Sequence, residues 1–221
     1  MLRFIYFTSV VIWGYLIMKD NEYFPVLLGG SGDFPIGLTP KYFPYAPRKL
    51  NCGLKNYILV TSGFHLYNFM KHVLDSKKND FIEMGLHHVV ALYLFGGLYF
   101  LNFWENGAAF AFLHDIADIF IMAARTFGET NHSNFAGGIF ACAMIVWFYT
   151  RIIVLPYLIY LVIISDVKVG YCSKEIFVYL LSCMFVLHCY WFFLFFKIIK
   201  KFIVTGVAED TVNKVESNKQ K

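Results

Sequence analysis

Long apolar stretches separated by short polar ones dominate the pattern of this chain. Six runs have about the 20 mostly apolar residues that a helix needs to cross a bilayer. Backbone inside lipid has to satisfy its own hydrogen bonds, and no alternating barrel pattern is present, so the runs predict helices. We expect these helices over about 2–18, 54–74, 84–104, 107–127, 135–164 and 175–203.

Two of these runs are irregular. The fifth contains Arg151 and Pro156, which predict an interruption of the helix there. The first is short, and Arg3 near its start is typical of a signal peptide. Because no small-residue cleavage site follows, we interpret this run as a retained membrane anchor.

The polar segments divide the chain into three parts. Residues 19–53 hold five of the six prolines and cannot cross a membrane as a helix. We therefore predict an N-terminal part over 1–53, made of the anchor helix and a Pro/Gly-rich loop. A helical core over 54–205 and a polar tail over 206–221 follow.

Composition strengthens the membrane assignment. Hydrophobic residues make up 58% of the chain and charged residues only 15%, whereas about a quarter of a soluble domain is charged. These values exclude a soluble globular protein, a disordered chain and a nucleic-acid binder. Lys and Arg are more frequent on the side of the two termini than on the opposite side. This favours termini in the cytosol, or in the matrix for a mitochondrial inner-membrane protein.

Ionisable residues inside the apolar runs gather on two helices. Each costs roughly 3 kcal/mol at membrane depth, so a cluster requires an explanation. The third run carries His87 and His88, and the fourth carries His114, Asp115 and Asp118. His114 and Asp118 are four residues apart and share a helix face, while Asp115 and Asp118 are three apart. Where the two helices meet, these five side chains are expected to converge.

Three interpretations of this cluster remain open. The first is a polar network that only holds the helices together. The second is a metal site, because histidines and carboxylates bind zinc or iron, although the HxxxH and HxxHH boxes of membrane di-iron enzymes are missing. The third, which we favour, is catalysis on a lipid substrate, since a neutral imidazole can deprotonate an amine or attack a thioester.

At these residues the chain resembles the TLC-domain family, and within it the ceramide synthases with their longevity-assurance motif. The resemblance covers about 55–205. The residues that carry it, in the order and spacing of the family, are Lys78, Asp80, Phe81, Met84, His87, His88, Tyr99, Asn102, Gly107, His114, Asp115, Asp118, Arg151, Pro156, Leu187, His188 and Trp191.

The resemblance implies an all-α, six-helix membrane bundle around a central cavity. It also implies an N-acyltransferase that joins a fatty acyl-CoA, as co-substrate, to a sphingoid base without a cofactor or metal. The implied catalytic residues are His87, His88, His114, Asp115 and Asp118. The implied substrate-binding residues are Tyr99, Asn102, Arg125, Arg151, His188 and Trp191. The implied location is the endoplasmic reticulum membrane, with the mitochondrial inner membrane as the alternative.

Several positions depart from the family motif. Leu98 and Ala117 stand where the family has serines, and Met122 stands where it has a glutamate. These changes favour a second hypothesis, a catalytically degenerate protein that binds lipid or serves as a subunit of a larger membrane complex. The interruption of the fifth helix is the support for a third hypothesis, a transporter or scramblase.

Further basic residues lie near the end of the second run. We expect His65 and His72 at the membrane interface. Lys71, Lys77 and Lys78 are predicted at the cytosolic mouth of the cavity, where they meet either lipid headgroups, as we favour, or the phosphates of CoA.

Overall fold

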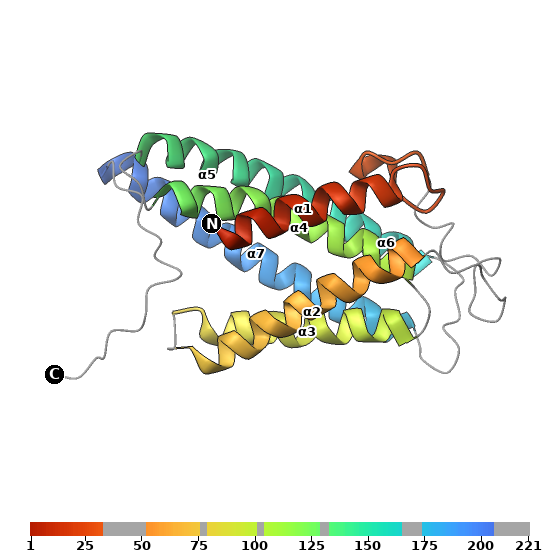
Figure 1. Cartoon of the computed structure of the whole chain (residues 1–221). Helices are drawn as coiled ribbons and strands as arrows, with labels where there is room; N and C mark the ends of the chain where they lie inside the picture. The colour runs from red at the N-terminus through yellow and green to blue at the C-terminus, as the bar shows by residue number, and fades with distance from the viewer. Residues whose placement is uncertain (33–51, 76–78, 101–103, 129–132, 165–173, 206–221) are drawn as a thin grey trace.

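The protein is an elongated bundle of helices in a computed structural model (Figure 1). The structure describes residues 1–32, 52–75, 79–100, 104–128, 133–164 and 174–205. Its α-helices are α1 (Leu2–Met18), α2 (Cys52–Leu74), α3 (Phe81–Phe100), α4 (Trp104–Gly128), α5 (Ser133–Trp147), α6 (Leu155–Ile164) and α7 (Lys174–Thr205). A π-helical segment, Phe148–Val154, joins α5 to α6, and a short 3-10 helix, Val26–Leu28, follows α1.

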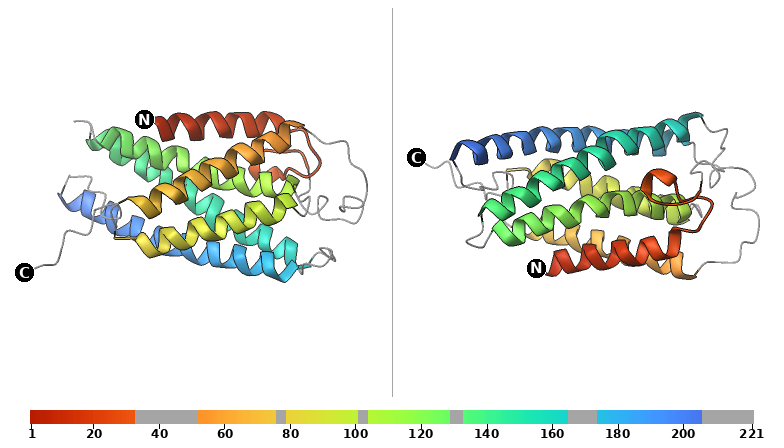
Figure 2. Two further views of the ribbon diagram at one scale, coloured as in Figure 1. Left: turned by 60° about the horizontal axis from the view of Figure 1, so that its bottom comes forward. Right: turned by 90° about the horizontal axis from the view of Figure 1, so that it is seen from above.

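The helices run lengthwise beside one another (Figure 2). α4 packs along α1 and α5, α2 packs on α3, and α6 packs on α7. As a result α4 is the most enclosed of the membrane-spanning helices. In α4, 67% of the most apolar 18 residues are buried inside the protein, compared with 22% in α3. The polar residues of α4 are therefore surrounded by protein rather than by lipid.

Length and hydropathy identify the membrane helices. Within the described residues, α3, α4, the continuous helix over Phe135–Ile164 and α7 are long and apolar enough to cross a bilayer. α1 is apolar but has 17 residues, and α2 has 23 residues and a more polar sequence. The described residues form six helices when α5 to α6 is counted as one, and the protein is thus an all-α, polytopic membrane protein, which confirms the predicted fold class.

The third helix begins three residues earlier than the sequence predicted. Its first turn is closed by the amide of Met84, which donates to the carbonyl of Asp80 over 2.9 Å. Aspartate is a favoured residue immediately before a helix, and this preference explains the start at Phe81.

The fifth helix is irregular at Arg151, where the sequence predicted an interruption, but it does not break. The chain stays helical from Phe135 to Ile164 and changes its hydrogen-bond pattern to π-helical over Phe148–Val154. Pro156 has no amide hydrogen to donate to the carbonyl four residues earlier, and a π-helical turn accommodates this loss without a break. The transporter hypothesis depended on a broken fifth helix, and this helix is not broken.

The N-terminal helix is packed into the bundle. α1 contacts α4 and α2 and buries Phe7, Val10 and Met18. The segment after it also lies on the bundle, because the ring of Phe24 packs on that of Phe112 with centroids 5.1 Å apart. The rest of the Pro/Gly-rich loop and the polar tail lie outside the described residues.

Candidate functional site

Two adjoining cavities lie between the helices near the predicted site residues. The larger has a volume of about 170 Å³ and the smaller about 40 Å³. His65, His87, Asp118 and Arg151 line both. These four side chains therefore stand where the two cavities meet.

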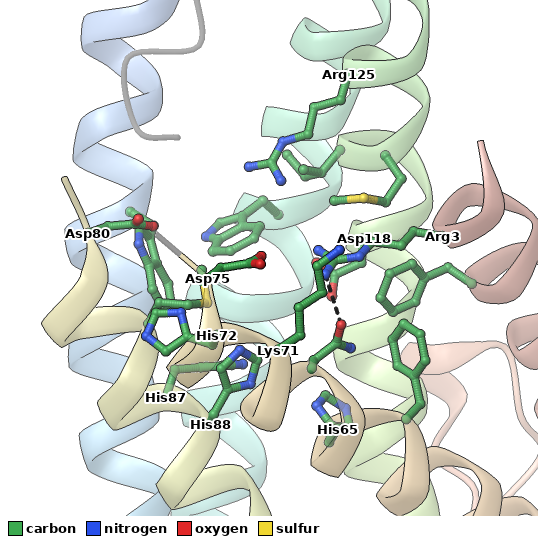
Figure 3. A pocket seen from close by; sticks show the side chains of 18 of the residues that line it. Arg3, His65, Lys71, His72, Asp75, Asp80, His87, His88, Asp118 and Arg125 are labelled. Carbon is green, nitrogen blue, oxygen red and sulfur yellow. Dashed lines mark hydrogen bonds between the residues drawn. The ribbon is translucent and has the colours of Figure 1, made fainter. Parts of the chain in front are cut away.

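The larger cavity is lined by apolar side chains together with charged side chains of both signs. Arg3 from α1, Lys71 from α2 and Arg125 from α4 reach toward the same space (Figure 3). Asp75 and Asp80 line the same cavity. Arg3 Nη2 also donates a hydrogen bond to Asn68 Oδ1 over 2.9 Å. A cavity with this lining suits a polar or charged group of a ligand.

The smaller cavity has apolar walls between α3, α4 and α7. Besides His114 and the four residues shared with the larger cavity, the residues that line it are apolar: Ala91, Leu94, Phe95, Leu98, Gly107, Phe110, Leu181 and Met184. On α3 the lining residues are spaced by three or four, which places them on one helix face. A cavity with this lining suits a hydrocarbon group.

Five imidazole rings form a row through the bundle, which we call the histidine row. The ring centroids of His72 and His88 lie 5.6 Å apart, and those of His88 and His87 also lie 5.6 Å apart. His188 continues the row 6.2 Å from His87, and His114 ends it 4.9 Å from His188. The row thus joins α2, α3, α7 and α4.

The tautomer of His114 follows from its hydrogen bond. Its Nδ1 lies 2.6 Å from the carbonyl oxygen of Phe110, which can only accept, so Nδ1 carries the proton. The buried Nε2 then has a free lone pair and no hydrogen-bond partner within the part of the chain that the structure describes. This nitrogen is available to accept a proton or to attack a carbonyl carbon.

Arg151 supplies a buried positive charge beside the row. Its Nη2 donates to Asp118 Oδ1 and to the carbonyl of His114, each over 2.8 Å. The guanidinium carbon lies 3.8 Å from the centroid of Trp147, and the residue is only 2% exposed. The ion pair fixes Asp118 at the junction of the two cavities.

The catalytic residues expected from the sequence separate into two groups. His87, His88, His114 and Asp118 line one or both cavities. Asp115 lines neither of the two and is 1% exposed. Both of its carboxyl oxygens lack a hydrogen-bond partner among the described residues. The catalytic role of all five residues stays a prediction.

The expected substrate-binding residues also differ in position. Arg125, Arg151 and Trp191 line the larger cavity. His188 is fully buried within the histidine row. Tyr99 lines neither of the two cavities and stacks on Trp104, with centroids 5.8 Å apart. Asn102 lies outside the described residues, and so do Lys77 and Lys78.

His65, His72 and Trp147 are cavity residues that the sequence interpretation missed. It placed the two histidines at the membrane interface and did not connect them with the site, and the structure has both in the cavity wall. Their spacing contained a signal, because positions 65, 68 and 72 lie on one face of a helix. Trp147, which donates from Nε1 to the carbonyl of His188 over 3.3 Å, had no comparable signal.

A shared metal ion would need several ligands around one point. Among the residues that the structure describes, no three His, Cys, Asp or Glu side chains are placed to hold one. The histidine row is extended, and its members follow one another instead of surrounding a common centre.

Comparison with known proteins gives consistent matches. The family described as the TLC domain matches residues 1–197. Ceramide synthase 4 of Mus musculus is 30% identical over 176 residues, which cover 78% of this chain and 45% of that protein. ASC1-like protein 3 of Oryza sativa subsp. japonica is 29% identical over 206 residues, covering 89% of this chain and 68% of that protein.

A more distant relative matches nearly the whole chain. Ceramide synthase hyl-1 of Caenorhabditis elegans is 21% identical over 223 residues, which cover 94% of this chain and 58% of that protein. The chain thus spans about half the length of several of the curated relatives that it matches.

Proposed function

The chain belongs to the TLC-domain family and is a ceramide synthase-like membrane protein, and from this premise we propose that it is an N-acyltransferase. In the proposed reaction a fatty acyl group moves from the thioester of acyl-CoA to the amine of a sphingoid base. The curated relatives whose names contain "ceramide synthase" support the substrate class. The endoplasmic reticulum membrane is the proposed location, and the mitochondrial inner membrane is the alternative.

The observation that carries this proposal is the position of His87. Its side chain lines both the larger cavity, which carries the charged side chains, and the smaller apolar cavity, at their junction. An acyl thioester has the same division, because a polar headgroup and a hydrocarbon chain meet at the reacting carbonyl. With the headgroup in the larger cavity and the start of the hydrocarbon in the smaller one, the carbonyl lies beside His87.

The reaction forms a C–N bond and breaks a C–S bond. The amine nitrogen attacks the thioester carbonyl carbon, His87 accepts the amine proton, and CoA leaves as a thiolate that takes up a proton. His114, whose Nε2 has a free lone pair, and Asp118, held by Arg151, complete the polar wall around the carbonyl. Direct attack by a histidine, with a transient acyl-imidazole, is the alternative route to the same products.

Acyl transfer by the purified protein in liposomes tests the proposal. The reaction would contain labelled acyl-CoA and a sphingoid base, with the double variant His87→Ala/His88→Ala as the control. We expect turnover by the wild type and none by a double variant that is still folded. A folded wild-type protein without turnover on any acyl-CoA would refute the proposal.

A second function is favoured by one specific observation. Met122, which stands where the family has a glutamate, lines the larger cavity. A cavity that lacks this carboxylate is compatible with a lipid-binding subunit of a larger membrane complex. Purification distinguishes the two functions, since a stoichiometric complex without turnover supports the subunit and a lone active protein excludes it.

A further inference from the structure

Acyl transfer to a sphingoid base leaves one proton to be removed from the bundle. The inference that follows rests on the proposed function. An alkyl amine is an ammonium ion at neutral pH, and its nitrogen gives up two protons on the way to an amide with a single N–H. One proton ends on the CoA thiol, and the other has to reach water before the next turnover.

The histidine row offers a way out from His87. The ring of His88 lies 5.6 Å from that of His87, and the ring of His72 lies 5.6 Å beyond it. Such centroid separations leave room for a direct hydrogen bond or for one bridging water between neighbouring rings. Histidine chains of this kind conduct protons at membrane depth in pumps and transporters.

The outer end of the row lies where water and charge are present. His72 belongs to the last turn of α2, next to the exposed Lys71 and close to the exposed Asp75. His72, Asp75 and Asp80 all line the larger cavity.

The hydrogen bond of His72 sets its ring in a defined orientation. Its Nε2 lies 2.9 Å from the carbonyl oxygen of Phe81, and therefore donates, while the ring stacks on that of Phe81 with centroids 4.5 Å apart. Nδ1 is then the nitrogen with a free lone pair. The ring is held in place by its donor nitrogen and can accept a proton at the other.

We propose that His88 and His72 form a proton exit path from His87 to the mouth of the larger cavity. Before the attack, His87 takes the first proton from the ammonium form of the amine and passes it to His88, and His88 passes it to His72, which releases it to water. The second proton, which His87 accepts during the attack, goes from His87 to the CoA thiolate. Each ring returns to the neutral form, so one proton leaves per amide bond formed. His72 and His88 move the proton, and neither needs to touch the reacting carbonyl.

His65 is the matched control on the same helix. Like His72 it is a half-buried histidine of α2 and lines the larger cavity. Its ring faces Phe95, with centroids 5.0 Å apart, and Phe64, with centroids 6.3 Å apart. The control therefore tests the loss of a cavity histidine outside the proposed path.

The experiment compares acyl transfer by the wild type, His72→Gln and His65→Gln in liposomes, with and without imidazole in the buffer. For His72→Gln we expect kcat to fall at least about tenfold while KM for acyl-CoA stays unchanged, since proton transfer is lost and binding is not. Added imidazole should restore kcat by carrying the proton. It should not restore any loss in His65→Gln.

The remaining outcomes overturn the inference. It fails if His72→Gln keeps the wild-type kcat, if its loss appears in KM, or if imidazole restores both variants or neither. His72→Phe keeps the stack on Phe81, lacks ring nitrogens, and serves as the second variant if His72→Gln does not fold. A wild-type protein that transfers no acyl group refutes the proposed function, and with it the proton exit path.

Discussion

The two polar faces of α4 have different surroundings. On one face His114 and Asp118 line the cavities, and Asp118 is paired with Arg151 over 2.8 Å. On the other face Asp115 is 1% exposed and lines neither of the two cavities. Both oxygens of its carboxyl group nevertheless lack a hydrogen-bond partner among the described residues.

The comparison shows that residues of one short motif need not act on one ligand. Successive residues of a helix point in directions 100° apart, and here His114 lines the smaller cavity whereas Asp115 lines neither of the two. The motif on α4 therefore has a cavity side and a packing side. Three experiments test this distinction.

The largest expected effect is the loss of Arg151. Arg151→Met leaves Asp118, whose side chain is 26% exposed, without its cation, and removal of one partner from a buried ion pair costs up to about 3–5 kcal/mol. We expect the variant to unfold at a markedly lower temperature, or not to accumulate, in a thermal unfolding assay. Arg151→Met/Asp118→Leu, which removes both charges, should recover much of the stability but no activity. A fully stable single variant would contradict the structural role of this pair.

A smaller effect is expected from replacing the two aspartates of α4 one at a time. Asp118→Asn removes the charge at the junction of the cavities, and we expect acyl transfer to fall by about 100-fold or more, the size typical of a lost acid–base group. Asp115→Asn changes the packing side and should lower the rate far less. Initial rates at saturating acyl-CoA measure both. Equal losses would show that the two faces act as one site and would support the catalytic role predicted for Asp115.

The smallest expected effect concerns the apolar cavity. A methyl group added by Gly107→Ala would lie 3.4 Å from Leu98 Cβ, so it fits and makes the cavity smaller. We expect a shift toward shorter acyl-CoA when a series of chain lengths competes in one assay. Gly96→Ala is the matched control, because no atom lies within 4 Å of its added methyl group. The same shift in both variants would exclude the apolar cavity as the acyl site.

Much of the fold could be predicted because membrane helices leave a strong pattern. The six apolar runs appear as helices, and the start of α1 at Leu2 agrees with the expected residue. The change to π-helical hydrogen bonding at Phe148 could not be predicted, since Pro156 and Arg151 also suit a broken helix. Only the packing of neighbouring helices decides between the two.

Less of the candidate site than of the fold could be predicted from the sequence. His87, His88, His114 and Asp118 stand out because charged and polar groups are rare in apolar helices. His72 does not stand out, because a histidine near a helix end is ordinary at an interface. Its neighbour in the row, His88, comes from another helix, and this contact depends on how α2 packs on α3.

The ion pair between α4 and the π-helical segment has a consequence for synthesis of the chain. Asp118 precedes Arg151 by 33 residues, so the ribosome makes the carboxylate first. At a translation rate of about 5–20 residues per second, the arginine follows roughly 2–7 s later. During that interval α4 carries an unpartnered acid that lipid disfavours. Newly made α4 therefore has to stay in contact with protein or water, and it inserts stably into the membrane only together with the helix that follows it.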